Sequence, residues 1–180
     1  MNANATGDIL YIEDNDVSPQ IDQQLRDLLS ICFDDQPVFK TQRFNKEIPQ
    51  HRWYIQSYNK IIAHVAVHDK TISINNTSYR IGGIAEVAVH PEHRGKGYVR
   101  EILKVVHKWL TERSFEFAML LGEAKVYASS GYVNIPNEIH YYDTKTQTWE
   151  THTIDCVMIK PIINDNWPEL GVVDLTGPTF

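Results

Sequence analysis

The stretch VAVHPEHRGKGYVREILKVVHKWL, from Val87 to Leu110, is the part of the sequence that decides the fold. A β-branched run leads to a proline, then to the turn Arg-Gly-Lys-Gly, and then to apolar residues that recur at helical spacing. The pattern predicts a strand, a tight turn and a long amphipathic helix. The turn gathers the basic side chains His93, Arg94, Lys96 and Arg100, although the chain as a whole is acidic. We therefore expect an anionic group to bind at this turn.

The backbone of this turn suits a phosphate group. The first amides of a helix have no acceptor within the helix, and the helix dipole adds positive potential there. Gly95 and Gly97 let the backbone approach an anion without a Cβ in the way. The spacing is neither that of a P-loop nor that of a dinucleotide-binding turn. A bare RGKG turn is more often a solvated surface loop, but its place between a strand and a long helix weakens that alternative.

Length and composition predict a single domain over residues 1–180. The chain has 180 residues, of which 42% are hydrophobic and 22% are charged, an ordinary balance for a globular protein. No apolar run approaches the ~18–20 residues that span a bilayer, and the N-terminal MNANATGDILYIED lacks the features of a signal peptide. Cys32 and Cys156 form no CxxC motif, so free thiols in a reducing compartment are the simplest interpretation. We expect a cytoplasmic protein without a membrane partner.

The charge of the chain also limits its partners. The formal net charge is -6 and the isoelectric point is about 5.7. Broad nucleic-acid binding needs a basic face. An acidic chain instead suits a cationic partner, with the basic turn as a local exception. We therefore expect no nucleic-acid partner.

The N-terminal patterns predict a strand, a helix and a loop. Gly7–Asp14 alternates enough to be an opening strand, and Ser18 caps an amphipathic helix that runs from Pro19 to Phe33. From Asp34 to Gln50 the periodicity dissolves, which indicates a long loop or short helices.

The rest of the chain completes a mixed α/β sheet with helices packed on it. Arg52–Pro91 predicts strands divided by turns, because asparagine tolerates left-handed backbone angles. The turn signals are Tyr58-Asn59-Lys60 and Asn75-Asn76, with a break at Gly82-Gly83. After the long helix we expect a strand at Phe115–Leu121, a short helix at Gly122–Ser130 closed by Gly131, strands at Tyr132–Ile135, Ile139–Thr144 and Cys156–Ile162, and a packed tail at Asn164–Phe180.

Two short motifs carry a resemblance to a known superfamily. VAVHPEHRGKGYV resembles the acetyl-coenzyme A loop of the Gcn5-related N-acetyltransferases (GNAT), written Q/R-x-x-G-x-G/A after a V-x-P strand end. Arg94, Gly97 and Val99 occupy the named positions, and Val99 departs from the usual Gly or Ala. The second signature, x-Y-x-x-x-G-[FY], is present as VYASSGY, with Tyr127 and Gly131. Both signatures at the right separation are more specific than either alone.

The resemblance implies the fold, the activity and the cofactor. It implies a mixed, mostly antiparallel α/β sheet of about six or seven strands flanked by helices. It also implies acetyl transfer from acetyl-coenzyme A to a primary amine, with the pantetheine arm held by the backbone of Val87 and Val89. The residues that would hold the pyrophosphate are Arg94, Gly95, Lys96, Gly97, Tyr98 and Val99. Homodimers are common in the superfamily, but the sequence leaves the oligomeric state open.

A narrower resemblance points to the acceptor. Trp53–Tyr132, in stretches such as IIAHVAV and VYASSGY, is similar to the aminoglycoside 2′-N-acetyltransferase group, as is the ending VMIKPI with VVDLTGPTF. In that group an acidic residue and a terminal aromatic residue lie near the amine. We therefore expect a small cationic acceptor, aminoglycoside-like or polyamine-like, bound by Asp34, Asp35, Asp155, Asp174 and Phe180. Each of these acids is as readily an ordinary surface residue.

Tyr127 is the candidate proton donor. It matches the superfamily's tyrosine, which would give a proton to the departing thiolate. The plainer alternative is a half-buried packing residue, since tyrosine is common at such boundaries.

Glu86 is the candidate base, acting directly or through a water. It interrupts the apolar strand IAEVAVH, and an alkyl amine titrating near ~10 must lose a proton before it can attack. Strand alternation places Glu86 with Ala88, opposite Val87 and Val89. In the narrower group the carboxylate falls at this chain's Ala85, and a one-residue offset changes the face. A bulge in this strand could re-aim Glu86.

The remaining patterns limit the alternatives. His64, His68 and His90 lie in or beside strands without a metal-binding spacing, so we predict no metal. Two other functions stay open. One is a degenerate module that binds coenzyme A without turnover, and the other is an N-acyltransferase that uses a peptide amine or a longer acyl donor.

Overall fold

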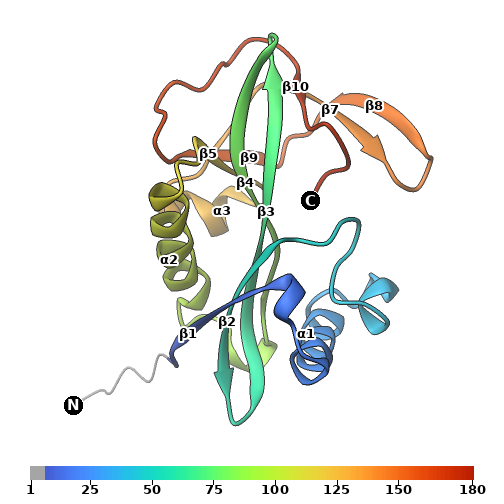
Figure 1. Cartoon of the computed structure of the whole chain (residues 1–180), viewed down its shortest axis with the longest axis vertical. Coiled ribbons are helices and arrows are strands. Elements are labelled where there is room, and N and C mark those ends of the chain that lie inside the picture. The colour runs from blue at the N-terminus through green and yellow to red at the C-terminus, as the bar shows by residue number, and fades with distance from the viewer. Residues whose placement is uncertain (1–6) are drawn as a thin grey trace.

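The computed structural model describes residues 7–180 and shows a curved mixed sheet with helices packed on it (Figure 1). The strands are β1 (Ile9–Glu13), β2 (His51–Ser57), β3 (Lys60–Ile74), β4 (Thr77–Val89), β5 (Phe117–Leu121), β6 (Val133–Asn134), β7 (Glu138–Asp143), β8 (Thr148–Thr153), β9 (Val157–Pro161) and β10 (Val173–Asp174). The helices are α1 (Pro19–Cys32), α2 (Tyr98–Glu112) and α3 (Ala124–Tyr127), with short 3-10 helices η1 (Asp14–Asp16), η2 (Pro37–Lys40), η3 (Pro91–His93) and η4 (Ala128–Ser130).

The sheet order within the described residues is β6-β9-β5-β4-β3-β10-β7-β8, and β2 pairs with β3 and with β1. The pairs β4–β5 and β7–β10 are parallel, and the others are antiparallel. The predicted mixed, mostly antiparallel α/β class is confirmed. No helix among residues 7–180 is long and apolar enough to cross a bilayer.

The two long helices cover opposite faces of the central strands. α2 buries Ile102, Leu103, Val106 and Leu110 in the largest core cluster, which includes Trp53 of β2. α1 buries its leucines against the other face, where Tyr54, the next residue of β2, lies. The predicted N-cap of α1 is confirmed, since the Ser18 side chain accepts a hydrogen bond from the Ile21 amide. α1 ends at Cys32, one residue before the predicted end.

The predicted hairpin turns are confirmed. Tyr58 and Asn59 have φ values of 48° and 58°, and Asn75 and Asn76 have φ values of 51° and 63°. Positive φ at both central residues matches the twist of the strands that a tight hairpin joins. Gly131, with φ 90°, ends the short helical segment as expected.

The expected strand break at Gly82-Gly83 is wrong, because β4 runs through both glycines. A Cβ at Gly82 would lie 2.6 Å from the Leu110 side chain, and one at Gly83 would lie 2.9 Å from the Phe180 ring. The glycines therefore admit α2 on one face of the sheet and the C-terminal segment on the other.

The expected strand count was too low, since the sheet has ten strands among the described residues. β8 was missed because its sequence TWETHT is polar and exposed on both faces, which leaves no apolar alternation. β10 was missed because only Val173 and Asp174 form it, pairing with the end of β3 and with β7. β6 is also shorter than the predicted strand at 132–135.

Candidate active site

β4 and β5 separate at the centre of the sheet. Their parallel pairing reaches only to Ile84 and Leu120, while β4 continues to Val89. Residues 85–89 therefore pair with β3 on one side and have an open edge on the other. An open strand edge presents backbone donors and acceptors that an extended ligand can use.

A bulge lies in this open part of β4. The β3–β4 register shifts between His64 and Ala66, so that Glu86 and Val87 lie opposite a single residue of β3. Glu86 has a φ of 50°, a left-handed value that is uncommon for a residue with a side chain. Simple alternation therefore fails here, and the bulge aims the Glu86 side chain.

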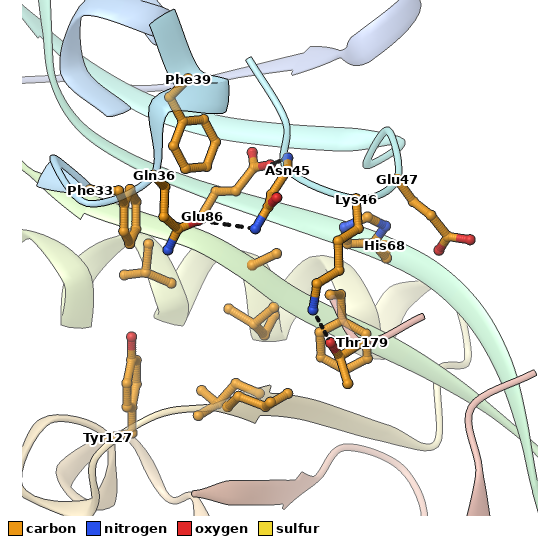
Figure 2. A pocket seen from close by; sticks show the side chains of 16 residues that line it. Phe33, Gln36, Phe39, Asn45, Lys46, Glu47, His68, Glu86, Tyr127 and Thr179 are labelled. Atoms are coloured by element: carbon orange, nitrogen blue, oxygen red, sulfur yellow. Dashed lines mark hydrogen bonds between the residues drawn. The ribbon is translucent and has the colours of Figure 1, made fainter. Parts of the chain in front are cut away.

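The bulge borders a cavity of about 250 Å³ (Figure 2). Side chains from the segment after α1, from β3 and β4, from β5 and α3, and from the C-terminal segment line it together. They are Phe33, Gln36, Phe39, Asn45, Lys46, Glu47, His68, Ile84, Ala85, Glu86, Val87, Leu120, Leu121, Tyr127, Thr179 and Phe180. A neighbouring cavity of about 620 Å³ shares Gln36, Asn45, Lys46, Leu121 and Thr179 with it, and extends to β7.

The Glu86 carboxylate is held at both oxygens. Arg52 Nη1 donates to Oε2 at 2.8 Å, and the backbone N–H of Asn45 donates to Oε1 at 3.2 Å. The side chain is only 7% exposed. Burial raises the pKa of Glu86 to about 7, although Arg52 opposes the rise. A carboxyl group with this pKa exchanges a proton readily at neutral pH.

Tyr127 faces the same cavity from α3 (Figure 2). Its ring packs over Gly122, where any Cβ would collide with it. Its hydroxyl points into the cavity and makes no hydrogen bond to the part of the chain that the structure describes. Burial raises the pKa of Tyr127 to about 12, so the hydroxyl keeps its proton at neutral pH.

The glycine turn is open on its outer side. Gly95 and Gly97 have φ values of 75° and 80°, and a Cβ at either would meet nothing within 4 Å. Between residues 7 and 180, no protein acceptor takes a hydrogen bond from the amides of Gly95, Lys96 or Gly97. Arg94 Nε donates to the Val89 carbonyl at 3.2 Å, which ties the turn to the end of β4. The turn therefore offers free amides at the start of α2.

Tyr98 and Val99, the two residues after the glycine turn, can offer a ligand their backbone but not their side chains. Tyr98 is only 8% exposed, with its side chain in the core, and Val99 packs against the same cluster. The Val99 side chain, which departs from the GNAT motif, thus points toward the core.

The residues expected to bind the acceptor are scattered. Phe180 lines the first cavity, with its ring centroid 6.0 Å from that of His68, and Asp35 lines the second. The structure does not bring the other three acids to either cavity. Asp34 and Asp155 are exposed, and the Asp174 carboxylate accepts a hydrogen bond from the Thr176 amide at 2.8 Å.

Sequence reasoning missed several residues of the cavity. Asn45 and Lys46 lie in the stretch without periodicity, so no pattern marked them. Figure 2 shows Lys46 reaching across the cavity to hydrogen-bond Thr179. Arg52 and His64 are both fully buried and contact Glu86. Their signal was the same as that of Glu86, a polar side chain inside an apolar strand.

One group of side chains could hold a metal ion among the described residues. His90, Glu92 and His93 lie at η3, with their ligand atoms within 4.8 Å of one another. His90 Nδ1 already accepts a hydrogen bond from the Glu92 amide at 3.3 Å. The expectation of no metal stays a prediction.

Comparison with known proteins identifies the family. Residues 18–135 match the family model described as an acetyltransferase (GNAT) domain. The chain belongs to the GNAT acetyltransferases. No curated protein matches the sequence. The narrower resemblance to aminoglycoside 2′-N-acetyltransferases therefore stays a prediction.

Solved structures of GNAT proteins share the fold. The GNAT family N-acetyltransferase YhbS from Escherichia coli, solved in complex with CoA, has a TM-score of 0.66 at 15% identity, over 97% of this chain and 93% of that chain. ElaA from Escherichia coli has a TM-score of 0.61 at 12% identity, over 85% and 98% of the two chains. A GNAT family acetyltransferase from Brucella melitensis, solved with acetyl-CoA, has a TM-score of 0.58 at 13% identity, over 92% and 94%. Some matches are longer proteins, such as Eis1 from Mycobacterium abscessus, of which this chain covers 32%.

Proposed function

We propose that this GNAT acetyltransferase transfers an acetyl group from acetyl-coenzyme A to a primary amine of a small acceptor. The observation that carries the proposal is the position of Glu86 and Tyr127 in one cavity, at the open edge of β4. The Glu86 carboxylate, which can accept a proton near neutral pH, thus shares a cavity with the Tyr127 hydroxyl, which stays protonated at that pH.

The chain offers a fitting place for coenzyme A. The free amides of Gly95, Lys96 and Gly97 would hold the pyrophosphate, and nothing within 4 Å of a Cβ at either glycine crowds them. The open edge of β4 at Val87 would hold the pantetheine arm. The Val89 carbonyl already accepts hydrogen bonds from Cys32 and Arg94, so Val89 would contribute less. When bound, acetyl-coenzyme A supplies the thioester that carries the acetyl group.

In acetyl transfer, Glu86 accepts a proton and Tyr127 donates one. Glu86 takes a proton from the acceptor ammonium, which leaves a nucleophilic amine. As the new C–N bond forms and the C–S bond breaks, the Tyr127 hydroxyl donates a proton to the leaving sulfur. The amine gives up its second proton, which replaces the one that Tyr127 donated. The acceptor thus releases both protons that acetylation requires.

The acceptor class rests on charge. The net charge of -6 supports a small cationic amine, aminoglycoside-like or polyamine-like. Glu86 and Glu47 are the acidic side chains that line the first cavity, and Asp35 and Asp143 line the second. Lys46 lines both and would repel a second ammonium group at that point. The acids therefore favour a cation in either cavity.

Thiol release tests the proposal. The experiment measures acetyl-CoA-dependent thiol formation against a panel of aminoglycosides, polyamines, amino acids and a lysine peptide, with a longer acyl-CoA as a second donor. We expect release that depends on both acetyl-CoA and a small amine. Affinity for coenzyme A without amine-dependent release would favour the binding module, and selective use of the peptide or of the longer donor would favour the other acyltransferase. Light scattering on the same sample measures the oligomeric state, which the sequence leaves open, and tests for the homodimer that is common in the superfamily.

A further inference from the structure

We infer that Arg52 is the residue that positions Glu86 as the base, by holding its carboxylate and, through His64, its backbone. The inference rests on the proposed function, in which Glu86 takes the proton. Arg52 belongs to neither GNAT motif in the sequence, and it does not line the first cavity. Among the described residues, Arg52 hydrogen-bonds to Asp14, His64 and Glu86, and of these three Glu86 lines the cavity.

Arg52 binds the Glu86 carboxylate from outside the set of residues that line the cavity. Its side chain is fully buried on β2, where Nη1 lies 2.8 Å from Glu86 Oε2 and Nε lies 2.6 Å from Asp14 Oδ1. Asp14 on η1 is itself 3% exposed and also binds Arg43, at 2.5 Å from Nη2 to Oδ2. A buried acid thus fixes the guanidinium at Nε, while Nη1 binds Glu86. One rigid side chain sets where the Glu86 carboxylate lies.

Arg52 also reaches the backbone of the bulge. His64 Nδ1 lies 2.9 Å from the Glu86 carbonyl, which can only accept, so Nδ1 carries the proton. Nε2 then has a free lone pair and accepts from Arg52 Nη1 at 3.3 Å. Burial lowers the pKa of His64 to about 3, which keeps the ring neutral in this tautomer. The chain of contacts therefore holds the carbonyl of a residue whose φ is 50°.

The charges around Glu86 oppose one another. Arg52 favours the ionised carboxylate, whereas Asp14 disfavours it. The buried Arg52 Nη2 has no hydrogen-bond partner in residues 7–180. Asp14 therefore does not satisfy all the donors of the guanidinium. The other titratable or charged groups that face this site are the neutral His64 behind the bulge and Lys46, Glu47, His68 and Tyr127 around the cavity. Arg52 is the only cation that contacts the Glu86 carboxylate among the described residues.

This arrangement predicts opposite effects for two neighbouring substitutions. Arg52→Gln removes the charge that favours the ionised carboxylate, so the pKa of Glu86 should rise further. Asp14→Asn removes a negative charge and leaves the Arg52 charge less neutralised, so the pKa of Glu86 should fall. A merely structural role predicts a different pattern, because loosening the site would admit water and lower the pKa in both variants.

Carbon-13 NMR of the glutamate side-chain carboxyls measures the effect directly in the full chain without substrate. Glu86→Gln assigns the signal by its absence. We expect the titration midpoint to move up by about one pH unit or more in Arg52→Gln, and to move down in Asp14→Asn. The acidic limb of the pH–rate profile, measured with the best amine of the panel above, should shift in the same directions.

Arg80→Gln is the matched control. It removes an arginine from β4 whose ion pair with Asp69, at 2.6 Å, lies on the surface, so the Glu86 midpoint should not move. If Arg52→Gln does not fold, Arg52→Lys keeps a cation but cannot bridge Asp14, Glu86 and His64, and should give a smaller upward shift. Midpoints that stay unchanged, or that move the same way in both variants, would overturn the inference. Wild-type protein without amine-dependent thiol release would instead overturn the proposed function, whatever the midpoints do.

Discussion

The donor and acceptor sides of the site are built in different ways. The donor side is one continuous segment, residues 87–99, in which a strand, a glycine turn and the start of α2 follow in chain order. The acceptor side combines residues 33–47, the middle of β3 and residues 179–180. The donor side offers backbone amides, and the acceptor side offers side chains. A site made from the backbone of one segment leaves a motif in the sequence, whereas a site assembled from distant segments leaves none.

Glu86 lies where the two sides meet, so its removal should have the largest effect. In Glu86→Gln we expect kcat/KM for the amine to fall by about 10²–10⁴, the usual contribution of a positioned acid or base. The affinity for acetyl-coenzyme A, measured by calorimetry, should stay the same because the glycine turn is untouched. A loss shared equally by donor affinity and turnover would contradict the division into two sides.

The pH profile sharpens the same test. Because the pKa of Glu86 is raised to about 7, the carboxylate is protonated and inactive as a base below that pH. Wild-type kcat/KM should therefore rise with pH and level off above about 8, provided that the buffer does not itself supply a base. The Glu86→Gln variant should lose this rise near pH 7. If kcat/KM of wild type and variant rose with the same midpoint, the rise near pH 7 would belong to a group other than Glu86.

Gly97→Pro should break the donor side alone. Proline removes one of the free amides and cannot adopt the φ of 80° that Gly97 has. Coenzyme A binding should weaken by at least about 100-fold, because a hydrogen bond to a charged group contributes about 1.5–3 kcal/mol and the turn also changes shape. Lys96→Ala is the control, and should weaken binding only a few-fold. If calorimetry finds both variants equally mild, the turn is not the anion site.

The same division explains what the sequence could predict. The helices, the hairpin turns at Asn59 and Asn76 and the glycine turn follow from local patterns, and all are present. The bulge at Glu86 could only be left open, because it depends on how β3 pairs with β4. Its consequence for Glu86 is large, since a shift of one residue decides which face a strand side chain occupies.

Apart from Phe180 and Asp35, the residues of the acceptor side could not be predicted, for a physical reason. The acidic net charge and the narrower resemblance led to four aspartates as expected acceptor residues, but neither says which surface each aspartate reaches. Asn45 and Lys46 line the cavity because the segment after α1 folds over β4, and no periodicity records that path. Gly83 gave a usable signal, because a glycine inside a strand often marks a close approach, here by Phe180.

Tyr127→Phe should have a smaller effect than loss of Glu86. A thiolate leaves more readily without a proton than an alkoxide does, so we expect kcat to fall by about 50-fold, just below the usual range for a general acid. KM for acetyl-coenzyme A should change little, since the ring that packs over Gly122 is kept. Single-turnover measurements should establish that chemistry limits the rate. An unchanged chemical rate would remove Tyr127 from the mechanism.

The smallest expected effect separates the two tail residues that the sequence analysis assigned to the acceptor. Phe180 lines the cavity. Asp174, on β10, instead accepts a hydrogen bond from the Thr176 amide. Phe180→Ala removes apolar contact worth about 1 kcal/mol to a bound acceptor, so KM for the amine should rise about five-fold. Asp174→Asn should leave KM unchanged at low salt, where any attraction between exposed charges is strongest. Coenzyme A affinity should be the same in both.

The salt dependence of KM for the amine distinguishes two roles for the C-terminal segment, which are long-range attraction by Asp174 and direct contact by Phe180. If Asp174 attracts a polycation from a distance, Asp174→Asn should raise KM at low salt, and the rise should vanish as the Debye length falls to about 8–10 Å. If position in the cavity decides, the Phe180→Ala effect should persist at high salt, because contact with an apolar ring is not screened. A salt-sensitive Asp174 effect together with a silent Phe180→Ala would mean that the acceptor binds along β10 rather than beside Glu86.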